Sequence, residues 1–551
     1  MSHSGPSLMY VLYILILLIV SFNLCTNGQK LPTENEKEEI VVDDLLPKEV
    51  VVIGAGIAGL AAARRLSADK QNFTVKVYEA RRDRYGGRIW TDKLTNMKAR
   101  GAEVDLGGSA LSVISKENPL IELAEKFDLK VASVQKLQFI IPWKKISYSG
   151  DDLSKITHQA AQILGQAVNE SKTEKIEVSM KEAIDKVLGK RETEDLDSAA
   201  AHLVRCLPSY ILDNYSSRNY KPENIDVGYD KLLLDGMGEL IDRLVSGSTE
   251  EPPLHLNLNK AARQIKVDKG RRKVLVRFHG GVQVAADIVV VAVPVSVIAS
   301  GELLFEPDLP KKYQLALHEI SISAGNKVIV EFEHAFWSAE YGVFTRAVRT
   351  DAERGNLQTW VNVNNLIGHP VLIGLLFGQP AVEFEILNPE EAKNYVIDVL
   401  NEMFGEDLVK QGGKVVRFQH SKWVTDPLSL GASTYPKVGS DPGLWDTFSQ
   451  PLCPYIYFAG EHTSFEAHGT LHGAYNSGIR VGDQILTGLC ETLRKEEERR
   501  IEEARRKKEE QKNATKDDKL DDSLDDDVNI DEDEDDTVEE VAQSKKEKTE
   551  L

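Results

Sequence analysis

The stretch VVVIGAGIAGLAAARRLSADKQNFTVKVYEA, which spans residues 50–80, constrains the fold more than any other part of the chain. It opens with the β-branched apolar run Val50–Ile53, and such a run predicts a strand buried on both faces of a parallel sheet. A G-x-G-x-x-G pattern follows at Gly54, Gly56 and Gly59. The first glycine allows a tight turn, the second lets the backbone approach a diphosphate, and the third allows the next helix to pack closely on the sheet.

The elements after the glycines complete a dinucleotide-binding frame. We expect a helix over about residues 57–66. Its N-terminal amides and dipole would suit a diphosphate. A second strand is expected over residues 73–78, and Glu79 closes it twenty residues after Gly59, where a carboxylate can accept hydrogen bonds from ribose hydroxyls. A glycine-rich turn without a ligand is the alternative, but the order of elements favours a dinucleotide. The acid favours a free ribose, as in FAD or NAD, over NADP.

Length and charge limit the classes of function. With 551 residues, the chain can form two domains with sizeable cores. Its formal net charge is −20, but residues 517–540 contain fifteen acids and one lysine, so about −14 lies in that segment. The remainder is only mildly acidic, which argues against nucleic acid as the main partner and is compatible with a cationic substrate.

The cysteines indicate no metal site. Cys25, Cys206, Cys453 and Cys490 form neither a C-x-x-C pair nor a cysteine–histidine spacing typical of zinc. Removal of a leader would leave three cysteines, which allow one disulfide, but the sequence does not select the pair. Buried free thiols are the alternative.

The N-terminus predicts entry into the secretory route. Residues 8–20 are thirteen unbroken apolar residues, which is short for a membrane-spanning helix and typical of the apolar region of a signal peptide. We interpret residues 1–28 as a signal peptide or an uncleaved membrane anchor, and residues 29–47 as a linker. The protein is then secreted or stays anchored, and it contacts a membrane only if the segment is uncleaved. Four N-x-S/T triplets fit this route, at Asn72, Asn169, Asn214 and Asn513.

Three further motifs carry a resemblance to a known family. Residues 79–89 read EARRDRYGGRI, residues 456–464 read IYFAGEHTS, and residues 469–480 read GTLHGAYNSGIR. Together with the dinucleotide unit, these motifs resemble the flavin-dependent amine oxidases, the family of monoamine oxidases, polyamine oxidases and flavin histone demethylases. The resemblance covers roughly residues 50–489, and its flavin motifs are more specific than its substrate motifs.

The resemblance implies an α/β fold, with a Rossmann-like FAD-binding domain of the amine oxidase type and an inserted α+β substrate domain. Three separated segments would build the FAD-binding domain: residues 48–117, 225–303 and 415–490. Two insertions would build the substrate domain: residues 118–224 and 304–414. Residues 491–551 are expected to form a charge-laced helix followed by a disordered acidic tail, because such a composition cannot bury a core.

The resemblance also implies the cofactor and its contacts. Monoamine oxidases attach FAD through a cysteine, and no cysteine lies between Trp423 and Pro451, so we expect non-covalent FAD. Trp423 would stack near the flavin, although a core tryptophan is the alternative. The expected FAD-binding residues are Gly54, Gly56, Ala58, Gly59, Glu79, Ala80, Arg81, Gly86, Gly87, Arg88, Ala262, Trp423, Gly460, Glu461, Thr470 and Leu471.

Lys327 is the expected catalytic residue. It enters an apolar strand, SISAGNKVIVEF over residues 321–332, although burial of an ammonium group is costly. A lysine that reaches water from a strand end is the alternative. The segment resembles the family's K-V…F…F-W pattern, in which the lysine holds a water against flavin N5. His472 has the chemistry of a base, but the resemblance implies a structural role for it.

The substrate motifs are less complete. Residues 102–109, AEVDLGGS, resemble a further flavin-contacting turn of the family. Plant polyamine oxidases carry a Trp and a Glu shortly after this turn, where this chain has Ala110 and Ser112. Relatives often carry a Tyr at position 470 as half of an aromatic cage, and this chain has Thr470. We therefore predict that Thr470 lines the substrate pocket, with Tyr435 and Trp445 as candidates for the aromatic wall.

The expected activity is oxidation of an amine, with oxygen as the electron acceptor and hydrogen peroxide as a product. A polyamine such as spermine or spermidine is the leading substrate. An L-amino-acid oxidase is the rival enzyme, for which Arg346 or Arg349 would bind the carboxylate. A catalytically silent flavoprotein that acts as a binding module is the rival from another class, although Lys327 argues against it. The sequence does not indicate an oligomeric state.

Overall fold

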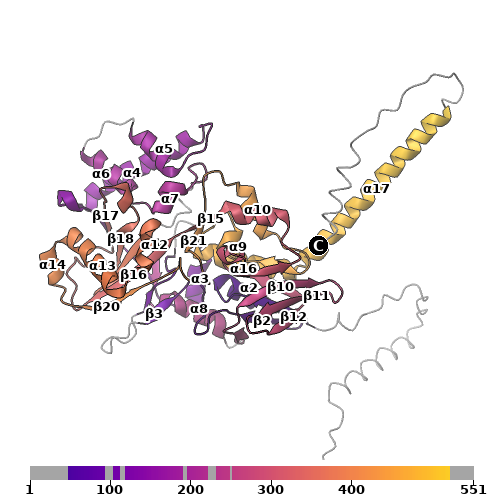
Figure 1. Cartoon of the computed structure of the whole chain (residues 1–551), viewed down its shortest axis with the longest axis horizontal. Helices are drawn as coiled ribbons and strands as arrows, with labels where there is room; N and C mark the ends of the chain where they lie inside the picture. The colour runs from indigo at the N-terminus through magenta and orange to yellow at the C-terminus, as the bar shows by residue number, and fades with distance from the viewer. Residues whose placement is uncertain are drawn as a thin grey trace, which may run out of the picture. The chain divides into compact units, whose positions relative to one another are not determined.

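The computed structural model describes residues 47–93, 103–111, 118–189, 195–220, 231–248 and 251–521 (Figure 1). The predicted signal segment and Ser112 lie outside these ranges, as do all but one residue of the predicted linker and the acidic segment beyond residue 521. Everything described below belongs to the unit that begins at Lys48. In the part of the chain that is described, no helix has both the length and the apolar character needed to span a bilayer.

The centre of the dinucleotide region is a parallel sheet of five strands. The predicted strands 50–53 and 73–78 pair with each other in parallel, and Val50 lies opposite Ile288 on the other side. The sheet draws on three separated segments of the chain. Its order is β22 (Ile456–Phe458), β13 (Ile288–Val291), β1 (Lys48–Ile53), β2 (Phe73–Tyr78) and β9 (Leu256–Asn257).

Both faces of this sheet are covered, which explains the unbroken apolar run in β1. Val50 and Val52 pack in one core, whereas Val51 and Ile53 pack in another. The first core contains helices α2 (Ile57–Ser67), α3 (Pro119–Lys126), α8 (Gly236–Ser246) and α16 (Leu471–Leu486). The second contains α10 (Lys311–Glu319) and a four-stranded sheet, β12 (Gln283–Ala286), β11 (Lys273–Phe278), β10 (Ala262–Asp268) and β14 (Leu304–Glu306).

A mixed sheet of seven strands forms the centre of the substrate region. Its successive side chains alternate between two faces, so Ile329 packs with Val104 and Leu106, whereas Val328 and Val330 pack beneath helices. The order is β20 (Val415–His420), β16 (Gly325–Phe332), β19 (Val371–Phe377), β18 (Asn356–Asn362), β17 (Val343–Arg346), β6 (Leu137–Ile141) and β7 (Ile146–Tyr148).

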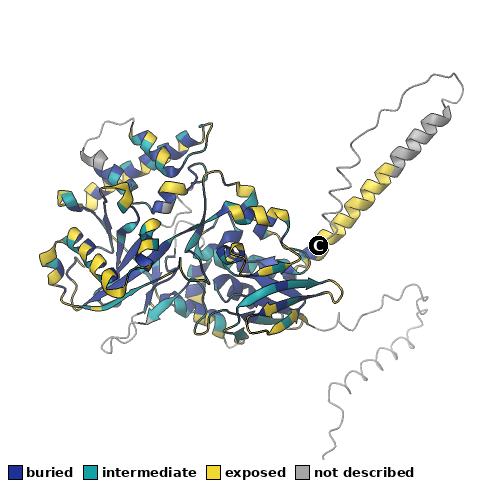
Figure 2. Cartoon of the chain, viewed as in Figure 1, coloured by how far each residue is buried: buried dark blue, intermediate teal, exposed yellow. Residues whose placement is uncertain are grey.

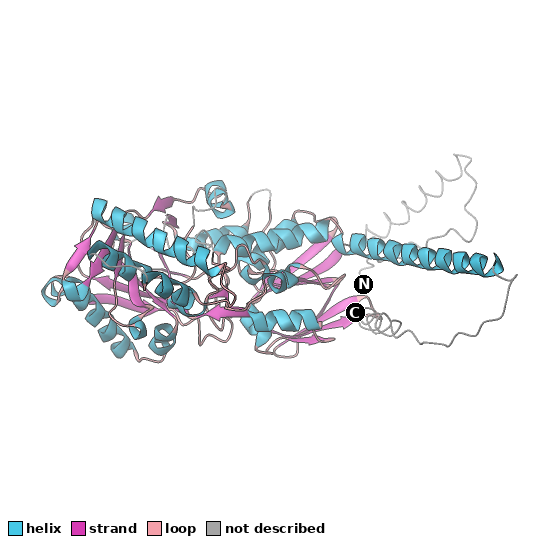
Figure 3. Ribbon diagram, turned by 90° about the horizontal axis from the view of Figure 1, so that it is seen from above, coloured by secondary structure: helices cyan, strands magenta, loops and turns pink. Residues whose placement is uncertain are grey.

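Two groups of helices cover the substrate region, and their buried residues appear dark blue in Figure 2. Around β16, β18 and β19 lie α12 (Gln379–Glu385), α13 (Pro389–Phe404) and α14 (Glu406–Lys410). Around β6 lie α4 (Gly150–Ser171), α5 (Met180–Leu188), α6 (Asp195–Val204) and α7 (Ser209–Asn214). Figure 3 shows these helices and strands by type.

Short strand pairs and short helices make up the rest of the described core. The paired strands are β3 (Thr91–Lys93) with β4 (Glu103–Asp105), β5 (Val131–Ser133) with β8 (Lys231–Leu233), and β15 (Ile320–Ser323) with β21 (Ser433–Pro436). The short helices are η3 (Pro142–Lys144), α9 (Val295–Ala299), η5 (Asp351–Glu353), α11 (Asn364–Ile367), α15 (Pro442–Trp445), η6 (Asp446–Ser449) and η7 (Glu461–Thr463).

Three predicted boundaries between the domains are displaced. The segment 415–420 was predicted to begin the last FAD-binding segment, but β20 pairs with β16 in the substrate sheet. Helix α3, predicted in the substrate domain, packs its apolar face in the core around β1. Strand β14 pairs with β10, and α10 packs in the core beneath the dinucleotide sheet. An amphipathic pattern gives the buried face of an element but not the core that receives it.

The C-terminal helix and the cysteines complete the fold. Helix α17 (Leu489–Asp521) begins two residues before the predicted charge-laced segment of residues 491–551. Nearly all of its described side chains are exposed, and they appear yellow in Figure 2. Cys453 and Cys490 form a disulfide, with a Cα–Cα distance of 5.3 Å, and Cys206 is a free thiol.

Candidate active site

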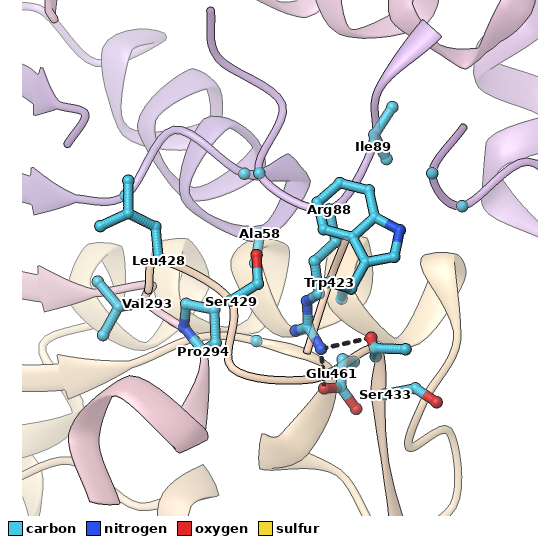
Figure 4. A pocket seen from close by; sticks show the side chains of 18 of the residues that line it. Ala58, Arg88, Ile89, Val293, Pro294, Trp423, Leu428, Ser429, Ser433 and Glu461 are labelled. Carbon is cyan, nitrogen blue, oxygen red and sulfur yellow. Dashed lines mark hydrogen bonds and ion pairs between the residues drawn. The ribbon is translucent and has the colours of Figure 1, made fainter. Parts of the chain in front are cut away.

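A cavity of about 570 Å³ runs from the glycine turn after β1 to the substrate sheet. Segments far apart in the sequence form its wall, and Figure 4 shows several of them around Arg88 and Glu461. All but one of the residues predicted to bind FAD line this cavity. The exception is Gly59, which lies behind the wall.

The glycine turn brings the backbone to the cavity wall. Gly54 has φ +102°, and a Cβ there would lie 2.5 Å from the carbonyl oxygen of Ala292. A Cβ on Gly59 would lie 2.0 Å from the carbonyl oxygen of Gly54, so this residue sets the approach of α2 to the turn. The first helical residues, Ile57 and Ala58, border the cavity, and α2 has no side-chain cap. This end of α2 therefore suits an anionic ligand.

Glu79 organises the turn from the end of β2. One carboxylate oxygen accepts a hydrogen bond from the backbone N–H of Ala55 at 2.9 Å, and the other accepts from that of Arg81 at 2.8 Å. Arg81 borders the cavity, and its guanidinium forms an ion pair with Asp426 and a hydrogen bond to Ser429. Arg81 therefore joins the end of β2 to a second segment of the cavity wall, and its contact with FAD stays a prediction.

Arg88 and Glu461 join the two predicted flavin motifs. The guanidinium of Arg88 lies 3.0 Å from a carboxylate oxygen of Glu461 and donates to the carbonyl of Ala432 at 2.9 Å (Figure 4). Glu461 is buried and also accepts from Thr434 and from the backbone N–H of Gly469. Burial alone would raise the pKa of Glu461, but Arg88, His462 and these donors together lower it. Glu461 is therefore a carboxylate that ties the strand end to the loop before α16.

Arg84 is a structural residue of the site that the sequence did not single out. Its guanidinium lies 5.2 Å from the ring centre of Trp90 and 5.8 Å from that of Trp423, and it donates to the carbonyl of Gly87 at 2.9 Å. Trp423 packs edge-on to Trp90 and borders the cavity. Arg84 therefore fixes the glycine pair and the tryptophan relative to each other.

Lys327 reaches into the cavity from β16. Successive side chains of β16 point to opposite faces of the sheet. Lys327 therefore points to the same face as Ile329, which packs against Val104 of β4. The Lys327 ammonium donates to the carbonyl of Gly107 at 2.7 Å and to the hydroxyl of Ser109 at 2.6 Å. Burial lowers the pKa of Lys327 to about 8, although the nearby carboxylate of Asp105 favours the charged form. Such a lysine changes its protonation state close to neutral pH.

Asp105 is the carboxylate next to this lysine. It is 7% exposed, accepts from the hydroxyl of Thr91, and accepts from the backbone N–H of Met237 at 3.1 Å, at the start of α8. Burial raises the pKa of Asp105 to about 6, although the charge of Lys327 opposes this shift. The two groups form a coupled pair behind the cavity wall.

The substrate end of the cavity has an aromatic wall. Tyr435 lines it as predicted, and Tyr215, which the sequence did not single out, stacks on it with ring centres 6.1 Å apart. The hydroxyl of Tyr215 lies 3.0 Å from Nε2 of His468, which also lines the cavity. Thr470 lines the cavity, and its hydroxyl accepts from the backbone N–H of Gly473 at the start of α16.

The prediction for Trp445 is wrong. Its side chain is fully buried in the core beneath the dinucleotide sheet, edge-on to Phe465 and His468, and it does not line the cavity. An aromatic residue in a short element can pack in a core or line a pocket, and the sequence around Trp445 does not distinguish the two. His472 borders the cavity near Thr470, and burial lowers its pKa.

Neither arginine proposed for an amino-acid carboxylate lines the cavity. Arg346 is 2% exposed, pairs with Glu402, and donates to two backbone carbonyls. Arg349 lies over the ring of Trp143, with 5.5 Å between its guanidinium carbon and the ring centre. Within the described residues, no group of three or more histidine, cysteine, aspartate or glutamate side chains could hold a metal ion.

The residues fit a flavin dinucleotide. The glycine turn leaves room for a ligand against the backbone, the start of α2 suits a diphosphate, and Glu79 ends the second strand.

Comparison with known proteins gives a consistent result. The family model described as flavin containing amine oxidoreductase matches residues 57–210 and 203–486. Polyamine oxidase 5 of Oryza sativa subsp. japonica is 29% identical over 465 residues, which cover 81% of this chain and 89% of that protein. Lysine-specific histone demethylase 1 homolog 1 of Arabidopsis thaliana is 28% identical over 460 residues, which cover 81% of this chain and 53% of that protein.

A solved structure also resembles the fold. The structure of wild-type putrescine oxidase bound to putrescine superposes with a TM-score of 0.63 at 21% identity. The match covers 80% of this chain and 99% of that one. At this identity the likeness concerns the fold.

Proposed function

Because this chain belongs to the flavin-containing amine oxidoreductase family and uses FAD, we propose that its substrate is a polyamine such as spermine or spermidine. Held against the glycine turn, the start of α2 and Arg88, FAD would supply the two-electron oxidation of the C–N bond, with oxygen as the final electron acceptor and hydrogen peroxide as the product. The oxidised substrate is an imine, and water converts it to an aldehyde and a smaller amine. The protein must bind the amine, orient it and exclude bulk water.

The observation that carries the assignment is the position of Lys327 in the cavity wall. Its nitrogen donates to the Gly107 carbonyl and the Ser109 hydroxyl, which fix its position. A lysine with a pKa of about 8 can hold a water molecule and exchange a proton near neutral pH. We assign Lys327 this role in the oxidation, whereas a flavoprotein that only bound partners would need no such group.

The aromatic wall supports an amine substrate. Tyr215 and Tyr435 present stacked rings to the cavity, and aromatic faces bind the alkyl chain and the cationic nitrogen of an amine. The relatives named polyamine oxidase make polyamines the leading choice. An L-amino acid is less suitable, because Arg346 is engaged with Glu402 away from the cavity and Arg349 lies on Trp143.

We further propose non-covalent FAD and a secreted or anchored protein. Within the described residues, no cysteine lines the cavity, so a thioether link to the flavin has no donor there. A disulfide between Cys453 and Cys490 suits an oxidising compartment, and Asn72, Asn169 and Asn214 are exposed in their N-x-S/T triplets.

The deciding experiment is anaerobic mixing of the purified protein with spermine while the visible flavin absorption is recorded. Rapid bleaching would establish polyamine oxidation. A yellow flavin that does not respond to spermine would remove the substrate proposal and leave the family in place, and primary monoamines and L-amino acids would be tested next.

A further inference from the structure

A buried polar network lies behind Trp423 and joins it to strand β16. Its members are Asn326 and Lys327 of β16, Glu385 at the end of α12, and Ser421 and Trp423 of the segment after β20. The side chains of Asn326, Glu385 and Ser421 are buried. Asn326 and Trp423 line the cavity, and Glu385 lies behind them. The network therefore connects the helices of the substrate region to the cavity wall.

Glu385 accepts three hydrogen bonds from amide N–H groups. One carboxylate oxygen accepts from the side chain of Asn326 at 2.6 Å and from the backbone of Val424 at 2.9 Å, and the other accepts from the backbone of Thr425 at 2.8 Å. A carboxylate satisfies all three donors because it offers acceptors alone. The two backbone donors directly follow Trp423, so Glu385 fixes the path of the chain beside the indole.

Asn326 carries this constraint to Trp423 and to Lys327. Its side-chain oxygen accepts from the backbone N–H of Trp423 at 3.0 Å and from the hydroxyl of Ser421 at 2.9 Å. The Ser421 hydroxyl accepts from the backbone N–H of Lys327 at 2.9 Å, and the backbone N–H of Ser421 donates to the carbonyl of Lys327 at 2.9 Å. The backbone of Lys327 is thus bound, through both its N–H and its carbonyl, to the segment that carries Trp423.

Local preference does not explain an acid at position 385. Glu385 is the last residue of α12, where the helix dipole disfavours a negative charge, and burial of a carboxylate is costly. The three groups that donate to it are neutral amides. Residues that break local rules in this way are expected at functional sites.

The side chains of Trp423 and Lys327 also end on one turn, which follows β4. The indole N–H of Trp423 donates to the carbonyl of Leu106 at 3.3 Å. The Lys327 ammonium donates to the next carbonyl along the chain, that of Gly107, at 2.7 Å. The two residues are therefore tied to each other twice, through the network around Glu385 and through this turn.

We propose that Glu385 is a positioning residue that holds the indole of Trp423 in a fixed place relative to Lys327, and so sets the surroundings of the bound flavin. The proposal rests on the FAD cofactor of the family and on the role proposed for Lys327. Because Glu385 does not line the cavity, it acts through Asn326 and Trp423. Small displacements of groups beside the reacting atoms lower the rate of the chemical step.

The test is a double-mutant cycle of Glu385→Gln and Trp423→Phe, measured by the visible circular dichroism of the bound flavin. The flavin ring is itself achiral, so this signal depends on the groups around it. Glutamine turns an N–H donor toward one of the amide donors, so we expect Glu385→Gln to change the signal in the wild-type background. In the Trp423→Phe background it should cause less than about one third of that change, because the residue through which Glu385 acts is absent. An equal change in both backgrounds would overturn the proposal.

A purely structural role for Glu385 gives a different result. Glu385→Gln would then lower the Tm but leave the dichroism of the bound flavin as in the wild type at equal flavin content, and this result would also overturn the proposal. Glu385→Asp keeps a carboxylate on a shorter side chain and should change the signal less than Glu385→Gln does. If the glutamine variant is not soluble, Glu385→Asp replaces it in the cycle with the same criterion.

Glu383→Gln is the matched control. Glu383 lies on the same helix, but it is exposed and accepts from the side chain of Gln379 at 3.0 Å. Its replacement should leave the dichroism of the flavin unchanged. Because the recording uses no amine, its outcome is separate from the outcome of the spermine experiment. With any amine that reduces the flavin, reduction of Glu385→Gln should be about tenfold slower than that of the wild type, and an equal rate would count against the proposal.

Discussion

The flavin end and the substrate end of the cavity are built in different ways. At the flavin end, backbone and short motifs form the wall: the turn at Gly54, the start of α2, and the Gly-Glu end of β22. At the substrate end, side chains from distant segments meet, such as Tyr215 after α7 and Tyr435 in β21. A backbone wall tolerates little change, whereas a wall of side chains can be altered one residue at a time.

The strongest test of this contrast is Gly54→Ala at the flavin end. The added Cβ would lie 2.5 Å from the carbonyl oxygen of Ala292, and the residue has a positive φ. We expect a loss of about 3 kcal/mol in the free energy of unfolding, together with loss of FAD. Urea unfolding and the flavin-to-protein absorbance ratio measure both. A stable variant with full flavin content would contradict the backbone-built wall.

Lys327→Met tests the residue at which the two ends meet. Methionine has a similar length but cannot hold water or exchange a proton, so we expect flavin reduction or reoxidation to slow on the order of 100-fold. FAD should remain bound, because the contacts of the glycine turn are unchanged. Stopped-flow measurement of each half-reaction decides the point, and unchanged rates in both would remove the role of Lys327.

The same lysine predicts a pH dependence of stability. The pKa of Lys327 is lowered to about 8 in the folded state, so between about pH 8 and pH 10 the unfolded chain binds more protons at this residue than the folded one. Stability of the wild type relative to Lys327→Met should therefore rise with pH across this window, on the order of 1–2 kcal/mol. Urea unfolding of both proteins at pH 7.5, 8.5 and 10 measures the difference. A constant difference would contradict the lowered pKa.

The smallest effect is expected from Tyr215→Phe at the substrate end. This change keeps the stacked ring and removes the hydroxyl that lies 3.0 Å from His468. We expect KM for the amine to rise about three- to tenfold, with unchanged FAD affinity. Steady-state kinetics and a flavin titration separate the two quantities. A loss of FAD affinity would show that the two ends are not independent.

The predictability of the two ends from the sequence differs for the same reason. The glycine turn, Glu79 and Glu461 belong to short motifs in which the spacing between residues determines how they contact a ligand. Their place in the site can therefore be predicted from the sequence. Lys327 was also predicted, because its segment resembles the family's K-V…F…F-W pattern; the apolar strand alone left a lysine that reaches water as the alternative. Gly54, Gly56, Glu79, Lys327 and Glu461 border the cavity in the structure.

The substrate end was only partly predictable. Tyr435 in β21 reaches the cavity and Trp445 in α15 does not, although both are aromatic residues in short elements of one segment. Tyr215 gave no signal, because only the fold brings the end of α7 to β21. Strand β20 was placed in the wrong domain, because pairing partners depend on contacts between distant segments rather than on local pattern.

The order of strands in the dinucleotide sheet has a consequence for biosynthesis. Strand β22, at one edge of that sheet, and the following residues through Leu471 supply part of the cofactor wall, although β1 opens the same sheet at residue 48. A nascent chain on the ribosome therefore lacks a complete FAD site until translation has passed these late residues. The long interval between the first and last strands leaves early apolar segments without their final packing partners during synthesis, so we expect mutations that delay closure to reduce yield before they reduce turnover.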